Sequence, residues 1–219
     1  MNDAILPIDL AASDARQEFR EFMQLYDGAI RAVRMKLEVL DSEFRVRYAR
    51  NPIHHIDARL KSPASISEKL RRKGLPPTLE AAEENLTDIA GVRIVCNYLE
   101  DIYRVAELLA HQGDVELVRR RDYIREPKDS GYRSLHLVVR VPVFLSSHTE
   151  LVPVEVQIRT IAMDFWATLE HQLRYKSDQE ATRQLRRRLR QCAEDSARLD
   201  AEMQSISTEL NGGREPEDA

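Results

Sequence analysis

The segment SGYRSLHLVVRVPVFLSSHTELVPVEVQIRT (residues 130–160) contains two runs of alternating apolar residues, separated by a short polar stretch. Because the side chains of a strand alternate between its two faces, each run predicts a β-strand with one apolar face. The polar stretch around Ser146, Ser147 and His148 predicts the turn between them. We therefore expect an antiparallel hairpin whose apolar faces meet a common core.

The opposite face of this hairpin carries polar and aromatic residues. On the first strand the alternation puts Tyr132, Ser134 and His136 on that face, and on the second strand it puts Glu155 and Gln157 there. A solvated outer face with cross-strand pairs is the simplest interpretation. However, an aromatic ring can stack on a base, and imidazole, amide and hydroxyl groups can bind its polar edges. This combination of residue types favours a nucleotide-binding surface.

The sequence around the hairpin predicts helices and further strands. Apolar residues in steps of three and four predict a long helix that runs from about Phe19 and ends before Asn51-Pro52. Between this helix and the hairpin we expect helices at 65–72, 78–86 and 101–112 and strands at 91–98 and 115–123, and after the hairpin helices at 161–176 and beyond 178. This order predicts an α+β fold in which helices pack around a mixed sheet.

The chain divides into four predicted parts. We expect a flexible N-terminus at 1–12, one α+β domain at 13–178, an amphipathic helix at 179–211 and a disordered tail at 212–219. In the C-terminal helix, apolar residues from Leu185 to Leu210 alternate in steps of four and three, which is a heptad pattern. This apolar seam can either pack on the N-terminal helix of the same chain or join copies of the chain.

The charge is acidic overall but uneven. The 219 residues contain 33 Lys and Arg and 37 Asp and Glu, a net charge of −4, which argues against a protein that binds nucleic acid with its whole surface. One stretch is nevertheless crowded with cations, which predicts a local anion site: Arg119, Arg120, Arg121, Arg125, Lys128 and Arg133.

Neither a secreted nor a membrane protein is indicated. The first residues lack the basic and apolar regions of a signal peptide, and no apolar run approaches the length of a membrane span. The two cysteines, Cys96 and Cys192, are far apart and lack metal-ligand spacing. We expect a cytoplasmic protein with two reduced thiols.

Two carboxylates and several polar residues predict a site for phosphates and a cation. Asp88 precedes one predicted strand and Glu155 lies on another, and two such carboxylates can hold Mg²⁺ through oxygen ligands. Ser65 and Lys69 lie four residues apart on one helix, and Ser65 with Glu68 forms a capping-box pattern that predicts a helix N-terminus close by. A capped helix with an exposed lysine is the alternative. No glycine-rich phosphate loop is present, so side chains would bind the phosphates.

Four segments together resemble the small alarmone synthetases, the single-domain members of the RelA/SpoT-homologue family. They are RLKSPASISEK (59–69), DIAGVRI (88–94), RDYIREPKDSGYRSLH (121–136) and EVQIRT (155–160), within a resemblance that covers about residues 50–178. The resemblance implies a nucleotidyltransferase-like fold and GTP pyrophosphokinase (GTP diphosphokinase) activity in the stringent response. Such an enzyme transfers the pyrophosphate of ATP to the ribose 3′-OH of GDP or GTP, giving ppGpp or pppGpp and AMP.

The same resemblance implies a role for each matched residue. Asp88 and Glu155 would be catalytic and would bind Mg²⁺, with Glu155 helping the metal or acting as base toward the 3′-OH. Arg59 and Arg93 would sandwich the adenine of ATP. The full set of ATP-binding residues would be Arg59, Lys61, Ser65, Lys69, Arg93, Arg119 and Arg121. The acceptor nucleotide would be bound by Tyr132, stacked on guanine, and by Lys128, His136 and Gln157.

Assembly and two other functions complete the expectations. The resemblance implies a homotetramer, and the lack of the family's His-Asp motif implies no hydrolase activity. A toxic relative that transfers pyrophosphate to tRNA is one alternative. A non-catalytic RNA-binding module that uses the arginine cluster and Tyr132 is the other. The pair Asp88 and Glu155 favours an enzyme, because binding alone does not need two carboxylates.

Overall fold

The sheet expected from the hairpin is present and contains five strands. The computed structural model describes residues 13–48, 50–176 and 183–211, so the expectations for 1–12 and 212–219 lie outside the described residues. The strand order is β1-β2-β5-β4-β3, with β2 and β5 parallel and the other neighbours antiparallel. The strands are β1 (Ile53–Leu60), β2 (Ala90–Cys96), β3 (Glu116–Asp122), β4 (Leu135–Phe144) and β5 (Thr149–Thr160). The predicted α+β fold with a mixed sheet is confirmed.

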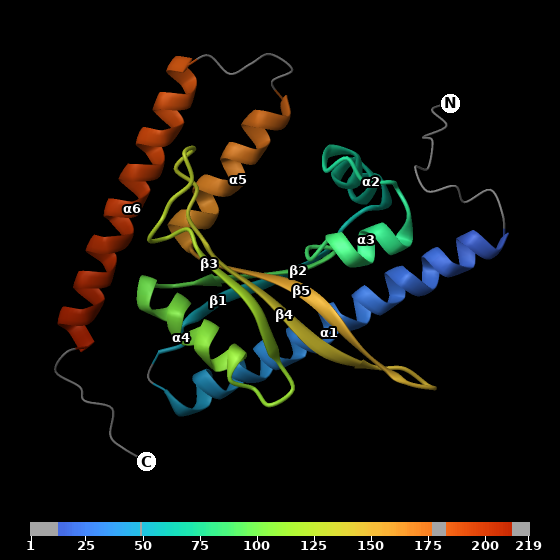
Figure 1. Ribbon diagram of the computed structural model, residues 1–219. Helices are drawn as coiled ribbons and strands as arrows, with labels where there is room; N and C mark the ends of the chain where they lie inside the picture. Colours follow the sequence, from blue (N-terminus) through green and yellow to red (C-terminus); the bar gives the residue numbers. More distant parts are fainter. Residues whose placement is uncertain (1–12, 49, 177–182, 212–219) are drawn as a thin grey trace.

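Helices surround this sheet (Figure 1). They are α1 (Ser13–Arg47), α2 (Pro63–Arg72), α3 (Leu79–Asn85), α4 (Leu99–Ala110), α5 (Ile161–Lys176) and α6 (Arg183–Asn211). Helices α1 and α4 cover one face of the sheet, and their apolar residues form the main core with the strands. The opposite face of the sheet carries the candidate site described below. None of the helices in the described part of the chain combines the length and apolar character that a membrane crossing requires.

Helix α1 buries its predicted apolar stripe against the sheet. Tyr26, Val33, Leu37 and Phe44 are all at most 2 % exposed. Burial also raises the pKa of the Tyr26 hydroxyl to about 12. The stripe on α1 is therefore already covered by the sheet and is not available to the apolar seam of α6.

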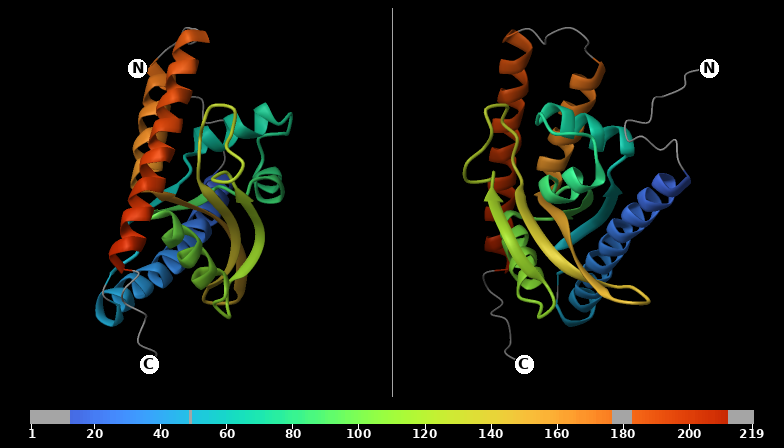
Figure 2. Two further views of the ribbon diagram at one scale, coloured as in Figure 1. Left: turned by 90° about the vertical axis from the view of Figure 1, so that its left-hand side faces the viewer. Right: turned by 45° about the vertical axis from the view of Figure 1, so that its right-hand side comes forward.

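Helices α5 and α6 lie side by side as an antiparallel pair (Figures 1 and 2). The residues that α6 buries are small or polar, namely Ala193, Asp200 and Ser207. The carboxylate of Asp200 accepts a hydrogen bond of 2.6 Å from Thr160 Oγ1, and burial raises its pKa above the ordinary value. The larger apolar residues of the seam remain exposed: Leu185, Leu199, Met203, Ile206 and Leu210.

Two local features differ from the sequence expectations. Strand β1 is not predicted, because IHHIDARL has no clear apolar alternation and only Ile53 in it is buried. Helix α2 begins earlier than expected, since Ser62 is its N-cap and accepts a hydrogen bond from the Ser65 backbone N–H. The predicted capping box of Ser65 with Glu68 is wrong. Pro63 explains the shift, because proline fits the first turn of a helix better than its interior.

Candidate active site

Two rows of side chains cross the sheet on the face opposite α1 and α4. Residues directly opposite each other on neighbouring strands share a face. The register places one row, from β1 to β3, at Asp57, Arg93, Gln157, His136 and Arg121, and the next row at Arg59, Gly91, Glu155, Val138 and Arg119. Strand pairing alone therefore gathers most of the predicted site residues on one surface.

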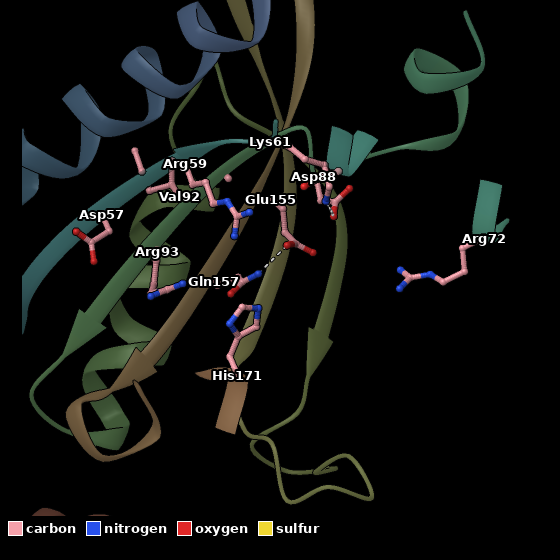
Figure 3. Close-up of a pocket in the computed structure, with 13 residues that line it drawn as sticks. Asp57, Arg59, Lys61, Arg72, Asp88, Val92, Arg93, Glu155, Gln157 and His171 are labelled. Carbon is pink, nitrogen blue, oxygen red and sulfur yellow. Dashed lines mark hydrogen bonds and ion pairs between the residues drawn. The ribbon is translucent and has the colours of Figure 1, made fainter. Parts of the chain in front are cut away.

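A cavity of about 610 Å³ opens over the β1, β2 and β5 part of this surface (Figure 3). Its lining includes seven of the predicted site residues, namely Arg59, Lys61, Ser65, Asp88, Arg93, Glu155 and Gln157. Arg72 of α2 and His171 of α5 also line it, although no sequence pattern distinguishes either of them. The charged side chains of this lining are four cations, Arg59, Lys61, Arg72 and Arg93, and three carboxylates, Asp57, Asp88 and Glu155.

Asp88 is the carboxylate at the α2 side of the cavity. Its Oδ2 atom accepts hydrogen bonds from Lys61 Nζ at 2.6 Å and Lys69 Nζ at 2.5 Å. Burial raises the pKa of Asp88, but the two lysines outweigh it and leave that pKa below its ordinary value. Oδ1 of Asp88 is buried without a hydrogen-bond partner in the described part of the chain. Asp88 is thus ionised at neutral pH with one oxygen available.

Glu155 is the second carboxylate, at the centre of β5. Its Oε2 atom accepts a hydrogen bond of 2.7 Å from Gln157 Nε2, and its Oε1 atom lies 3.5 Å from His136 Nδ1. Burial raises the pKa of Glu155, but hydrogen bonds from His136 and Gln157 lower it more, and the net pKa is below the ordinary value. The charge of Asp88 opposes this shift, so the two carboxylates are close enough to act on each other.

The carboxylates of Asp88 and Glu155 fit Mg²⁺ that is bound jointly by protein and substrate better than a metal ion whose ligands all come from the protein. Mg²⁺ is commonly bound by one or two carboxylates together with substrate phosphates and water. Ionised Asp88 and Glu155, with Oδ1 of Asp88 unpaired, supply such a pair. Across residues 13–48, 50–176 and 183–211, no group of three or more His, Cys, Asp or Glu side chains could hold a metal ion.

The second part of the site lies at the start of β4. Tyr132 comes from the segment between β3 and β4, and its hydroxyl lies 2.8 Å from Nε2 of His136. Lys128 Nζ lies 4.6 Å from the centroid of the Tyr132 ring and 4.5 Å from that of Tyr123. Tyr123 also contacts His136 edge-on at 5.1 Å between ring centroids. The structure thus brings together Lys128, Tyr132 and His136, and adds Tyr123, which the alternation of 130–160 could not indicate.

Arg119 and Arg121 connect the two parts. Arg119 donates a hydrogen bond of 3.1 Å to Oγ1 of Thr87, the residue before Asp88. Arg121 donates one of 3.3 Å to the hydroxyl of Tyr123, and Arg121 and Tyr123 both line a second cavity of about 800 Å³. Arg119 therefore faces the Asp88 side and Arg121 faces the tyrosines.

One residue of the predicted polar face is placed differently. Strand β4 begins at Leu135, and Ser134 is fully buried, where its hydroxyl donates to the backbone oxygen of Ile158 at 3.1 Å. Ser134 is therefore not on the open face. Tyr132 still reaches His136 because the chain turns at Gly131, which has a φ of +92°.

Gly131 offers a test of this turn. An added Cβ would lie 2.6 Å from Cβ of Ala193 in α6, and a positive φ costs a residue with a side chain roughly 1–2 kcal/mol. If the acceptor nucleotide binds at Tyr132 and ATP at Asp88, as the resemblance implies, Gly131→Ala should raise the KM of the acceptor more than the KM of ATP, because Tyr132 directly follows Gly131. Steady-state kinetics with each substrate varied would measure this, and Gly113→Ala is the control, since nothing lies within 4 Å of its added Cβ. An equal rise in both KM values would argue against the placement.

Known proteins match this chain in sequence and in structure. A family model described as the region found in RelA/SpoT proteins matches residues 58–180, more than half of the chain. GTP pyrophosphokinase YwaC of Bacillus subtilis is 41 % identical over 195 residues, which cover 89 % of this chain and 93 % of YwaC.

Two solved structures of small alarmone synthetase 1 from Bacillus subtilis have the same fold. The complex with its product pppGpp is 41 % identical, with a TM-score of 0.82 over 89 % of this chain and 98 % of that one. The complex with AMPCPP is 37 % identical, with a TM-score of 0.76 over 90 % and 99 %. On these matches, and on the motifs gathered at one face of its sheet, the chain belongs to the RelA/SpoT family.

Proposed function

We propose that this chain, a GTP pyrophosphokinase, transfers the pyrophosphate of ATP to the ribose 3′-OH of GDP or GTP at the face of the sheet described above. The observation that carries the proposal is the position of Glu155. It lies between the cavity around Asp88 and the aromatic group at Tyr132 and His136. A carboxylate between a phosphate site and a base-stacking site suits the joining of two nucleotides.

ATP would occupy the cavity around Asp88. Arg59 on β1 and Arg93 on β2 are suited to hold the adenine between their guanidinium groups. The triphosphate would be bound by Lys61, Ser65 and Lys69, with Arg119 and Arg121 further along the sheet. Both lysines contact Asp88, so with Mg²⁺ bound by that carboxylate their two ammonium groups would be free to bind the phosphates.

The acceptor nucleotide would occupy the surface at the start of β4. The Tyr132 ring can stack on guanine. Lys128, His136 and Gln157 supply donors for its ribose and phosphates. The complexes of relatives with pppGpp and AMPCPP support nucleotides as substrates.

The residues of this site would perform the transfer as follows. Asp88 and Glu155 would hold Mg²⁺, which neutralises phosphate oxygens during the attack. Glu155 accepts the proton of the 3′-OH, and its lowered pKa keeps it ionised at neutral pH. Lysine and arginine side chains stabilise the charge that develops on the AMP leaving group. Gln157 and His136 hold the Glu155 carboxylate in place.

The apolar surface of α5 and α6 supports self-association, and the family resemblance favours a homotetramer. On α5, Ile161, Phe165, Leu169 and Leu173 are four residues apart and all exposed. On α6 the seam from Leu185 to Leu210 is largely exposed, whereas the helix packs inward with small and polar residues. Exposed apolar stripes of this size favour closed symmetric assembly.

The two free thiols and the nucleotide substrates support a cytoplasmic location.

Leu199→Asp tests this assembly. Leu199 is 58 % exposed, so the charge should leave the fold of one subunit intact and separate the subunits. We expect light scattering to give an oligomer for the unmodified protein and a smaller species for the variant. Ala201→Asp, an exposed position away from the seam on the same helix, should leave the oligomer unchanged. A monomer of about 25 kDa for the unmodified protein at micromolar concentration would contradict the proposal.

A panel of acceptors tests the function itself. The protein is incubated with ATP and Mg²⁺ and with GDP, GTP or tRNA in turn, and AMP release is measured by chromatography. We expect AMP with GDP or GTP and none with tRNA. AMP with tRNA alone would identify a tRNA pyrophosphotransferase, and RNA binding without AMP release would identify an RNA-binding module. Omitting Mg²⁺ should abolish AMP release.

A further inference from the structure

A chain of contacts runs from the ATP side of the site to the acceptor side through Asp164 and Arg159. Asp164 lies in the first turn of α5, and Arg159 is the second-last residue of β5. Oδ1 of Asp164 lies 3.5 Å from Nη1 of Arg93 and 3.2 Å from Nη1 of Arg159. One carboxylate oxygen therefore contacts two guanidinium groups from neighbouring parallel strands.

Arg159 continues this chain toward the acceptor side. Its Nη2 atom donates hydrogen bonds of 2.7 Å to the Tyr132 hydroxyl and to Oε1 of Gln157, and its guanidinium carbon lies 5.2 Å from the Tyr132 ring centroid. Gln157 in turn donates to Glu155. Arg159 thus orients both the ring proposed to stack on guanine and, through Gln157, the carboxylate proposed to act as base.

A purely structural ion pair is the alternative explanation for these contacts. Arg159 is only 5 % exposed, and burying charges is costly, so a buried ion pair is weak evidence for stability. The Nε atoms of Arg93 and Arg159 are both buried without a hydrogen-bond partner among the residues described, which costs further folding free energy. A network that carries such costs and touches both sides of a site is better explained by function.

We propose that Asp164 and Arg159 are positioning residues that couple the binding of ATP to the binding of the acceptor nucleotide. The proposal rests on the roles proposed above for Arg93 and Tyr132. An adenine held by Arg93 fixes the shared carboxylate of Asp164, which fixes Arg159 and with it the Tyr132 ring. Coupling between two sites is reciprocal, so the bound acceptor nucleotide must increase the affinity for ATP by the same factor by which bound ATP increases the affinity for the acceptor.

Asp164→Asn tests the coupling, because it keeps the shape of the side chain and removes its charge. Calorimetry measures the Kd of AMPCPP, whose methylene bridge blocks transfer, and the Kd of GDP, each alone and with the other nucleotide at saturation and Mg²⁺ present. In the unmodified protein we expect each nucleotide to tighten the other by roughly 5- to 150-fold, the usual range for coupled sites. In Asp164→Asn this factor should fall toward one, with a smaller loss in either affinity alone.

Two further variants separate positioning from folding. Asp114→Asn removes the ion pair with Lys36, away from the site, and should keep the full coupling factor. Arg159→Lys keeps a charge for Asp164 but lacks the fork that reaches Tyr132 and Gln157, so it should lose coupling while its melting temperature stays near that of the unmodified protein.

The coupling inference is overturned if the unmodified protein shows no coupling, or if Asp164→Asn retains the full factor. The proposed function fails separately, if the unmodified protein releases no AMP from ATP and GDP.

Discussion

Glu155→Gln is expected to lower the rate of pyrophosphate transfer by orders of magnitude in a protein that remains folded. The substitution keeps the shape of the side chain but removes its negative charge, which is proposed to serve both the metal and the 3′-OH. A positioned general base alone contributes about 10²–10⁴-fold to a rate. The hydrogen bond from Gln157 can be kept and the burial of the site changes little, so the fold should survive. AMP release at saturating substrates measures kcat, and circular dichroism checks folding.

A second glutamate on the same strand provides the control. Glu150 lies at the exposed end of β5, where it pairs with His148 at 3.2 Å between Nε2 and Oε1. Glu150→Gln removes the same charge far from the cavity and should retain the kcat of the unmodified protein. Near-normal turnover in Glu155→Gln would remove Glu155 from the mechanism.

Tyr132→Ala is expected to raise the KM of GDP or GTP far more than that of ATP. Stacking of a base on an aromatic side chain contributes about 1–3 kcal/mol, or roughly 5- to 150-fold in affinity. ATP is proposed to bind at the other end of the face, around Asp88, so its KM should change less. Kinetics with each nucleotide varied at saturation of the other would separate the two effects.

Tyr132→Phe separates the ring from its hydroxyl. Phenylalanine can still stack, but it loses the hydrogen bonds with His136 and Arg159. Its acceptor KM should therefore lie between those of the unmodified protein and Tyr132→Ala. If Tyr132→Ala changed the two KM values equally, or changed that of ATP alone, guanine would not stack on this ring.

The central strands and the long N-terminal helix could be predicted because their burial is periodic. Strands β4 and β5 bury every second residue, and α1 buries residues three and four apart, so the apolar pattern follows the geometry. Strand β1 could not be predicted in this way. It lies at the edge of the sheet and carries mostly half-buried or exposed residues, including Arg59, so no apolar pattern marks it.

The contacts within the site were harder to predict than its residue types. Alternation places Glu155 and Gln157 on one face, and the register then adds Arg93 and His136 from neighbouring strands. Asp164 has no such signal, because it reaches Arg93 and Arg159 from a helix whose position depends on tertiary packing. The sharing of Asp88 by Lys61 and Lys69 likewise depends on how α2 packs beside β2.

The most direct test of the central claim is the identity of the product made from ATP and GDP in the presence of Mg²⁺. Phosphorus NMR of the reaction mixture distinguishes a pyrophosphate on the 3′-oxygen of guanosine from one added to the 5′-chain. We predict AMP and ppGpp in equal amounts, with the new pyrophosphate on the 3′-oxygen. Release of ADP and phosphate, or of AMP without a 3′-pyrophosphorylated guanosine nucleotide, would contradict the account.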